Sequence, residues 1–151
     1  MKRACEKELD VDCVICAAAV SDWRPLQVER RKIKKSNKKI PHLVLTETPD
    51  ILSWIGYHKS RPRLVIGFAA ETESLKINAA NKRKNKNVDW ILANLVFQSG
   101  VSVFNSDNNE VVFVSKNNVE DWGVNSKETV AQKLTDKISE YFSDDQAKEV
   151  V

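Results

Sequence analysis

Apolar runs alternate with segments of helical periodicity along most of this chain. Strands are predicted over 10–20, 63–70 and 89–93, where aliphatic and small residues follow one another with few interruptions. Long apolar runs of this kind are typical of parallel strands that are covered on both faces. Two shorter strands are predicted over 42–46 and 110–114.

Helices are predicted between and after these strands. The sequence Thr-Pro-Asp at 48–50 indicates a helix start, because a capping hydroxyl precedes a proline and an acid at the first turn. A second helix is predicted over 73–87, and a final one begins near Asn125 or Ser126, followed by apolar residues at helical spacing. The alternation of strands and helices predicts an α/β fold with a mostly parallel sheet.

The longest predicted connection, 21–41, is strongly basic. Seven of the ten residues from Arg30 to Lys39 are lysine or arginine. Such a density of like charge repels itself and attracts anions, so we expect a mobile lid loop that becomes ordered when a ligand binds. A solvated surface loop and a nucleic-acid-binding segment are the alternatives. The run contains no aromatic residue and the net charge is only +3, which argues against nucleic acid.

Candidate chemistry lies at the end of the first predicted strand, where Asp22 follows the apolar run. Ligands of open α/β sheets collect at the carboxyl ends of strands. An acid for a metal or a hydroxyl group, together with a basic loop for phosphates, suggests a nucleoside triphosphate site. The four glycines form neither a G-x-G-x-x-G nor a P-loop motif, so lysines would have to hold the phosphates. Lys82 and Lys86 lie one turn apart on one helix face, although a solvated helix end explains them as well.

Length and composition add few constraints. A chain of 151 residues with 42% hydrophobic and 30% charged residues is expected to be one domain, 1–151, with a polar, frayed tail at 144–151. No apolar run approaches the ~20 residues of a membrane span, and no signal peptide is evident, so we expect a cytoplasmic protein. The cysteines at 5, 13 and 16 are expected to be buried thiols, because three is an odd number and two of them would point to opposite strand faces.

Six motifs occur together and in order. They are VSDWRP at 20–25, KIKK at 32–35, PDI at 49–51, VIGFAAET at 65–72, K-x-x-x-K followed by NVDWILAN at 82–94, and FNSDNNEV at 104–111. This set resembles the carboxyl-terminal portion of the phosphopantothenoylcysteine synthetase (phosphopantothenate–cysteine ligase) domain of the bacterial coenzyme A biosynthesis bifunctional protein. The resemblance implies a Rossmann-like three-layer fold without its amino-terminal strand–helix unit. One departure is Thr48, where the family usually has asparagine.

The resemblance also implies a CTP site. Its residues would be Ala18, Ala19, Asp22, Lys32, Pro49, Asp50, Ile51, Leu52, Phe68, Lys82 and Lys86. Ala18 and Ala19 would lie along the cytosine, and Asp22 would lie near the triphosphate and its Mg²⁺. Lys32 would be the catalytic residue, closing over the phosphates on the lid loop.

The implied reaction is the CTP-dependent ligation of 4'-phosphopantothenate with cysteine through an acyl-cytidylate. The resemblance further implies a homodimer and association with a flavin-dependent phosphopantothenoylcysteine decarboxylase, which would carry the FMN that this chain lacks. The family's amino-terminal phosphate loops have no counterpart in 1–151, so we expect little activity from these residues alone. The alternative is a non-catalytic nucleotide-binding module that a separate chain completes.

Overall fold

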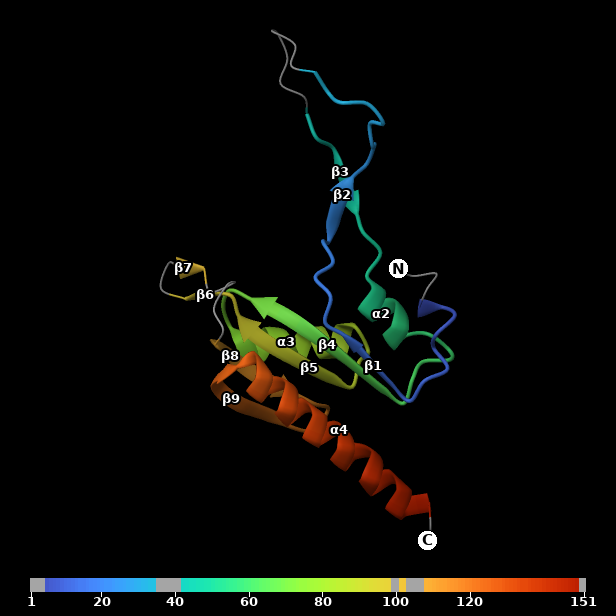
Figure 1. Ribbon diagram of the computed structural model, residues 1–151, viewed down its shortest axis with the longest axis vertical. Coiled ribbons are helices and arrows are strands. Elements are labelled where there is room, and N and C mark those ends of the chain that lie inside the picture. Colours follow the sequence, from blue (N-terminus) through green and yellow to red (C-terminus); the bar gives the residue numbers. More distant parts are fainter. Residues whose placement is uncertain (1–4, 35–41, 99–100, 103–107, 150–151) are drawn as a thin grey trace.

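A five-stranded mixed sheet forms the centre of the computed structural model, which describes residues 5–34, 42–98, 101–102 and 108–149 (Figure 1). The strand order is β1-β4-β5-β8-β9. The bounds are Cys13–Cys16 for β1, Leu64–Glu71 for β4, Trp90–Leu95 for β5, Asn108–Val114 for β8 and Val119–Ser126 for β9. The pairs β1–β4 and β4–β5 are parallel, whereas β5–β8 and β8–β9 are antiparallel. The sheet is therefore parallel only over its first three strands.

Helices cover both faces of this sheet. One core cluster joins alternate strand residues such as Val65 and Ile91 to Ile55 of α2 (Ile51–Gly56) and Ala79 of α3 (Leu75–Asn85). The alternate strand residues that face the other side of the sheet, such as Ile66 and Leu92, form a second cluster. This cluster includes Val130 and Leu134 of α4 (Lys127–Glu149). Burial on both faces explains why β4 and β5 read as continuous apolar runs. The Rossmann-like three-layer α/β fold is confirmed.

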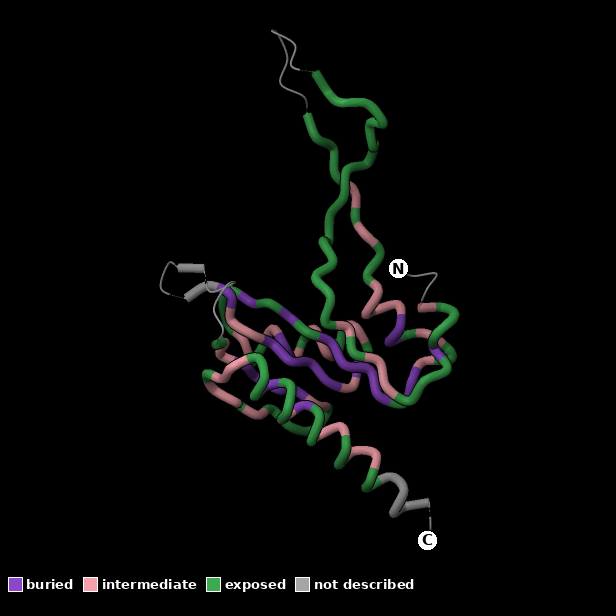
Figure 2. The backbone as a smooth tube through the Cα atoms, viewed as in Figure 1, coloured by how far each residue is buried: buried purple, intermediate pink, exposed green. Residues whose placement is uncertain are grey.

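β1 is shorter and more exposed than its sequence indicated. Only four residues are in the strand, against the eleven residues of the predicted 10–20 run, and Ile15 is 47% exposed. β1 lies at one edge of the sheet, with β4 as its neighbour. The expectation of a strand covered on both faces is therefore wrong for β1, since a central position is required for full burial. Beyond Cys16 the chain leaves the sheet and leads into an extended arm (Figure 2).

This arm contains a two-stranded antiparallel pair, of which residues 23–25 were predicted as loop. Trp23–Pro25 (β2) pairs with Leu45–Glu47 (β3), and both stand away from the main sheet (Figure 1). A proline is tolerated in β2 because a two-stranded ribbon has free edges that need no N–H donor. The predicted strand at 42–46 is thus shifted to β3. Part of the lid loop, 35–41, lies outside the described residues, and its mobility stays a prediction.

The helix boundaries differ from the predicted ones at several ends. Asp50, and not Thr48, caps α2, because its Oδ1 accepts the N–H of Ser53 at 3.0 Å. At the start of α4 the Ser126 hydroxyl accepts the N–H of Thr129 at 3.2 Å. α4 continues to Glu149, so the helix includes most of the expected polar tail. In the part of the chain that is described, no helix is long and apolar enough to cross a membrane.

Candidate functional site

A cavity of about 770 Å³ opens where the carboxyl ends of β1 and β4 meet the start of α2. Four segments line most of it: residues 14–22, which contain the end of β1, residues 48–52 at the start of α2, residues 68–70 of β4, and two lysines of the α3 end, Lys82 and Lys86. The position agrees with the expectation that ligand sites of parallel α/β sheets form at strand carboxyl ends. Its volume lies within the ~300–1,000 Å³ that is typical of small-molecule sites.

Ten of the eleven residues predicted to bind CTP lie around this one cavity. They are Ala18, Ala19, Asp22, Pro49, Asp50, Ile51, Leu52, Phe68, Lys82 and Lys86. Lys32 is the exception, because it is exposed on the arm and does not line the cavity. The fold therefore assembles residues from four separate segments, and their binding of CTP stays a prediction.

Lys86 is held at the cavity by Asp50. The Lys86 Nζ lies 2.5 Å from Asp50 Oδ2, so the residue that caps α2 also anchors the end of α3. Partial burial acts to raise the pKa of Asp50, but the hydrogen bonds from Lys86 and from the Ser53 N–H outweigh it, and the pKa is lowered. The carboxylate is therefore ionised at neutral pH and orients the ammonium group.

Lys82 has a corresponding acidic partner, which sequence reasoning did not place in the site. The Lys82 Nζ lies 2.8 Å from Oε1 of Glu71, the last residue of β4, whose side chain is 9% exposed. Burying a carboxylate is costly without a nearby cation. Among the described residues this oxygen accepts no aligned hydrogen bond, so the pairing is by charge. The only sign of this ion pair in the sequence was an acid at the end of one predicted strand, followed by a lysine in the next predicted helix.

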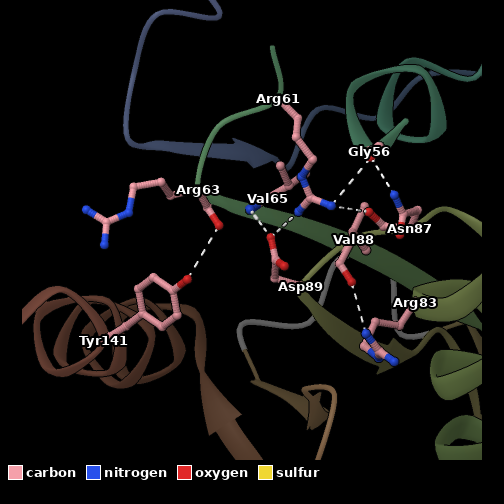
Figure 3. A network of polar contacts seen from close by, with 9 residues as sticks. All are labelled: Gly56, Arg61, Arg63, Val65, Arg83, Asn87, Val88, Asp89 and Tyr141. Atoms are coloured by element: carbon pink, nitrogen blue, oxygen red, sulfur yellow. Dashed lines mark hydrogen bonds and ion pairs between the residues drawn. The ribbon is translucent and has the colours of Figure 1, made fainter. Parts of the chain in front are cut away.

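The end of α3 is fixed against α2 by a polar network (Figure 3). The Gly56 carbonyl of α2 accepts hydrogen bonds from Asn87 Nδ2 at 2.7 Å and from Arg61 at 3.4 Å. Arg61 also donates to the Asn87 carbonyl at 2.8 Å and pairs with Asp89. A Cβ atom at Gly56 would lie 2.0 Å from the Lys86 carbonyl oxygen, so only glycine allows this approach. The network therefore determines where Lys86 sits relative to the cavity.

We expect Lys86→Gln to raise the pKa of Asp50, because the variant removes the strongest contact that lowers it. In the parent chain this lowered pKa stabilises the fold above the pKa of the unfolded chain, and the contribution is lost as pH falls through the folded pKa. The variant should therefore lose less stability on acidification than the parent. NMR titration of the Asp50 side chain measures the pKa directly. Lys82→Gln is the matched control, and an unchanged Asp50 pKa in Lys86→Gln would contradict the assignment.

A metal ion at the cavity would have few protein ligands. Within 5–34, 42–98, 101–102 and 108–149 no group of three or more His, Cys, Asp or Glu side chains could hold one. Asp22 is an exposed carboxylate at the cavity. A single carboxylate fits Mg²⁺, which keeps several waters and takes its other ligands from substrate phosphates.

The two strand cysteines face opposite sides of the sheet as predicted, but all three cysteines are only partly buried and not fully buried as expected. Cys16 packs with the cluster of α2 and α3, and Cys13 packs with the cluster of α4, so the two thiols face opposite sides of the sheet. Burial raises the pKa of both thiols. Protonated thiols on opposite faces form no joint metal or redox site.

Comparison with known proteins identifies the family. Residues 1–142 match the model described as DNA/pantothenate metabolism flavoprotein C-terminal domain. The coenzyme A biosynthesis bifunctional protein CoaBC of Haemophilus influenzae is 36% identical over 142 residues, which cover 94% of this chain and 34% of that protein. CoaBC of Borreliella burgdorferi is 34% identical over 124 residues, covering 82% of this chain and 30% of that protein.

A solved structure agrees with these matches. The crystal structure of the C-terminal domain of CoaBC aligns with a TM-score of 0.70 at 30% identity, covering 95% of this chain and 61% of that one. The chain spans about a third of the length of the two curated relatives. With the fold and the sequence in agreement, this chain belongs to the family of DNA/pantothenate metabolism flavoprotein C-terminal domains.

Proposed function

We propose that this chain forms the CTP-binding part of a phosphopantothenate–cysteine ligase and acts in coenzyme A biosynthesis. One observation carries the proposal: ten of the eleven residues that the family resemblance marked for CTP surround a single cavity. The two relatives described above are coenzyme A biosynthesis bifunctional proteins, which supports the pathway.

The cavity offers separate surroundings for a base and for a triphosphate. Ala18, Ala19 and Leu52 supply an apolar wall, and the Phe68 side chain is 39% exposed and available for contact with a base. Lys82 and Lys86 supply ammonium groups that are already positioned by their carboxylate partners. A bound triphosphate would attract both lysines, in competition with Asp50 and Glu71.

In the proposed reaction the carboxylate of 4'-phosphopantothenate attacks the α-phosphate of CTP, and pyrophosphate leaves with its bonding electrons. The cysteine amine then attacks the acyl carbon of the acyl-cytidylate, releasing CMP and a proton. Fixed cations stabilise the charge that grows on the leaving pyrophosphate. Lys82 and Lys86 would hold the phosphates, and Asp22 would hold the Mg²⁺ that helps to neutralise them. Lys32 contributes only after the arm folds toward the cavity.

A second candidate is a nucleotide-binding module that is completed by another chain. The position of β1 favours it, because this strand is at the sheet edge and its Ile15 side chain is half exposed beside the cavity. An exposed edge strand offers backbone groups for pairing with a further strand. The homodimer and the association with an FMN-carrying decarboxylase belong to the first proposal, the ligase, and stay predictions.

Calorimetric titration of the chain with CTP and Mg²⁺ tests the site. We expect CTP to bind, and Lys82→Gln to weaken CTP binding by about 10- to 100-fold, as for the loss of one charge-assisted contact. The matched control is Lys76→Gln, because Lys76 lies on the same helix but pairs with the exposed Asp121 away from the cavity. Equal losses in the two variants, or no CTP binding at millimolar concentration, would refute the proposal.

A further inference from the structure

A second hollow, of about 310 Å³, lies between α3 and the turn that joins β8 to β9. We refer to it as the basic groove. It is lined by Ala80, Asn81, Arg83, Lys84, Val114, Ser115, Lys116, Asn117, Asn118 and Val119. No residue is shared with the larger cavity, because the last turns of α3 direct Lys82 and Lys86 to the cavity and Arg83 and Lys84 to the groove.

The two hollows differ in how their cations are compensated. At the cavity, Lys82 and Lys86 are each paired with a carboxylate. At the groove, none of the three cations Arg83, Lys84 and Lys116 has an ion-pair partner in the described part of the chain, and no lining residue carries a carboxylate. Uncompensated cations around a concave surface attract anions more strongly than the same charges on a convex one.

Both walls of the groove are held in place. The β8–β9 turn is closed by the Ser115 N–H, which donates to the Asn118 carbonyl at 2.8 Å, and by the Asn118 N–H, which donates to the Ser115 hydroxyl at 3.1 Å. On the opposite wall, Arg83 donates to the Val88 carbonyl at 3.1 Å, so its guanidinium is fixed. Pre-positioned donors lose less entropy when a ligand binds.

Glu120, which follows the lining residue Val119 in the sequence, is already engaged. Glu120 accepts from Asn118 at 3.0 Å, but it also pairs with Lys137 at 2.7 Å and accepts from Trp122 at 3.0 Å. Partial burial acts to raise the pKa of Glu120, but these hydrogen bonds outweigh it and the pKa is lowered. The carboxylate is therefore ionised, and its main partner is Lys137 of α4. It therefore does not neutralise the cations of the groove.

We propose that the basic groove is a second anion site, which binds the phosphate or diphosphate group of a small metabolite. Lysine and arginine supply the charge, and the amide groups of Asn81 and Asn117 line the same hollow as further hydrogen-bond donors. The hollow is less than half the size of the cavity, which suits a small phosphorylated group better than a complete nucleoside triphosphate. The site is independent of CTP binding at the cavity.

Titration of the ¹⁵N-labelled chain with inorganic pyrophosphate, at ionic strength held constant with sodium chloride, tests this site by NMR. We expect amide shifts at 83–84 and 115–118 that saturate. The double variant Lys84→Gln with Lys116→Gln should bind pyrophosphate about tenfold more weakly, which corresponds to ~1.4 kcal/mol. The control double variant is Lys59→Gln with Lys127→Gln, since both lysines are exposed and outside both hollows, and it should change the affinity less than about twofold.

Several outcomes would overturn the assignment. Equal weakening in the two double variants would mean nonspecific attraction to positive charge. Shifts that are confined to 82 and 86 would mean that pyrophosphate binds only at the cavity. Binding of single-stranded RNA at the groove residues without a response to pyrophosphate would assign the groove to nucleic acid. In Lys82→Gln the groove response should persist, which separates this test from the test of CTP binding.

Discussion

Residues 1–151 alone are expected to bind CTP but to release pyrophosphate at less than about one thousandth of the rate of the assembled ligase. Among the residues that the structure describes, the lining of the cavity contains no glycine, so backbone N–H groups have no close approach to the phosphates through a glycine-rich loop. Three or more missing charge-assisted hydrogen bonds, at about 1.5–3 kcal/mol each, correspond to about 10³-fold or more. The exposed edge at β1 is where a further strand and its loop would complete the site.

The measurement is pyrophosphate release from CTP in the presence of 4'-phosphopantothenate. The chain is assayed alone and then with the part of the CoaBC C-terminal domain that this chain does not cover, which should restore turnover. The same addition to a Lys82→Gln chain is the control, because it supplies the added segment without the cavity lysine. Full turnover by residues 1–151 alone would rule out this prediction and the need for a completing segment.

The elements that were predicted best are those that can be recognised from their own residues, without knowing which other elements they pack against. β4 and β5 are recognisable from their composition because both faces are buried, at Val65 and Ile66 alike. α2 was recognisable because Pro49, the acid Asp50 and the terminal glycine are local signals. Local signals do not give the boundaries, since Asp50 caps α2 in place of Thr48.

The elements that were missed depend on long-range pairing. β9 has a partly exposed pattern and contains Gly123 at φ +69°, so nothing in its own composition marks a strand. It forms because it pairs with β8 along its whole length, across a register shift between Val111 and Val112. β2 is likewise stabilised by β3 and not by its own sequence. The energy that stabilises these strands comes from the pairing of two segments, and the periodicity of a single segment gives no information about it.

The candidate site shows the same difference between local signals, which could be predicted, and long-range contacts, which could not. Spacing alone put Lys82 and Lys86 on one helix face, and both do line the cavity. Their partners could not be inferred from spacing, because Glu71 and Asp50 come from a strand end and a helix cap that meet α3 only in the folded chain. Lys32 was predicted to lie at the site, but it lies outside the cavity. A basic run indicates that a segment attracts anions, but it does not give the direction of the arm, which depends on the β2–β3 pair.

Lys32→Gln in the assembled ligase is expected to lower the rate of acyl-cytidylate formation by about 10²–10³-fold, the usual effect of removing one transition-state charge contact. The CTP dissociation constant should change less than about threefold. Lys32 is exposed on the arm and outside the cavity, so it contributes little to holding CTP before the arm moves. An interaction that forms only as charge develops on the pyrophosphate affects the rate and not the ground-state affinity.

Rapid-quench measurement of acyl-cytidylate, together with calorimetry of CTP binding, separates the two effects. Arg30→Gln is the matched control, because Arg30 is an exposed cation of the same arm, and it should reduce the rate by less than about threefold through general charge loss alone. Parallel losses of rate and affinity in Lys32→Gln would make Lys32 a simple binding residue. Equal rate losses in the two variants would mean that the arm acts through its total charge and that no single lysine closes over the phosphates.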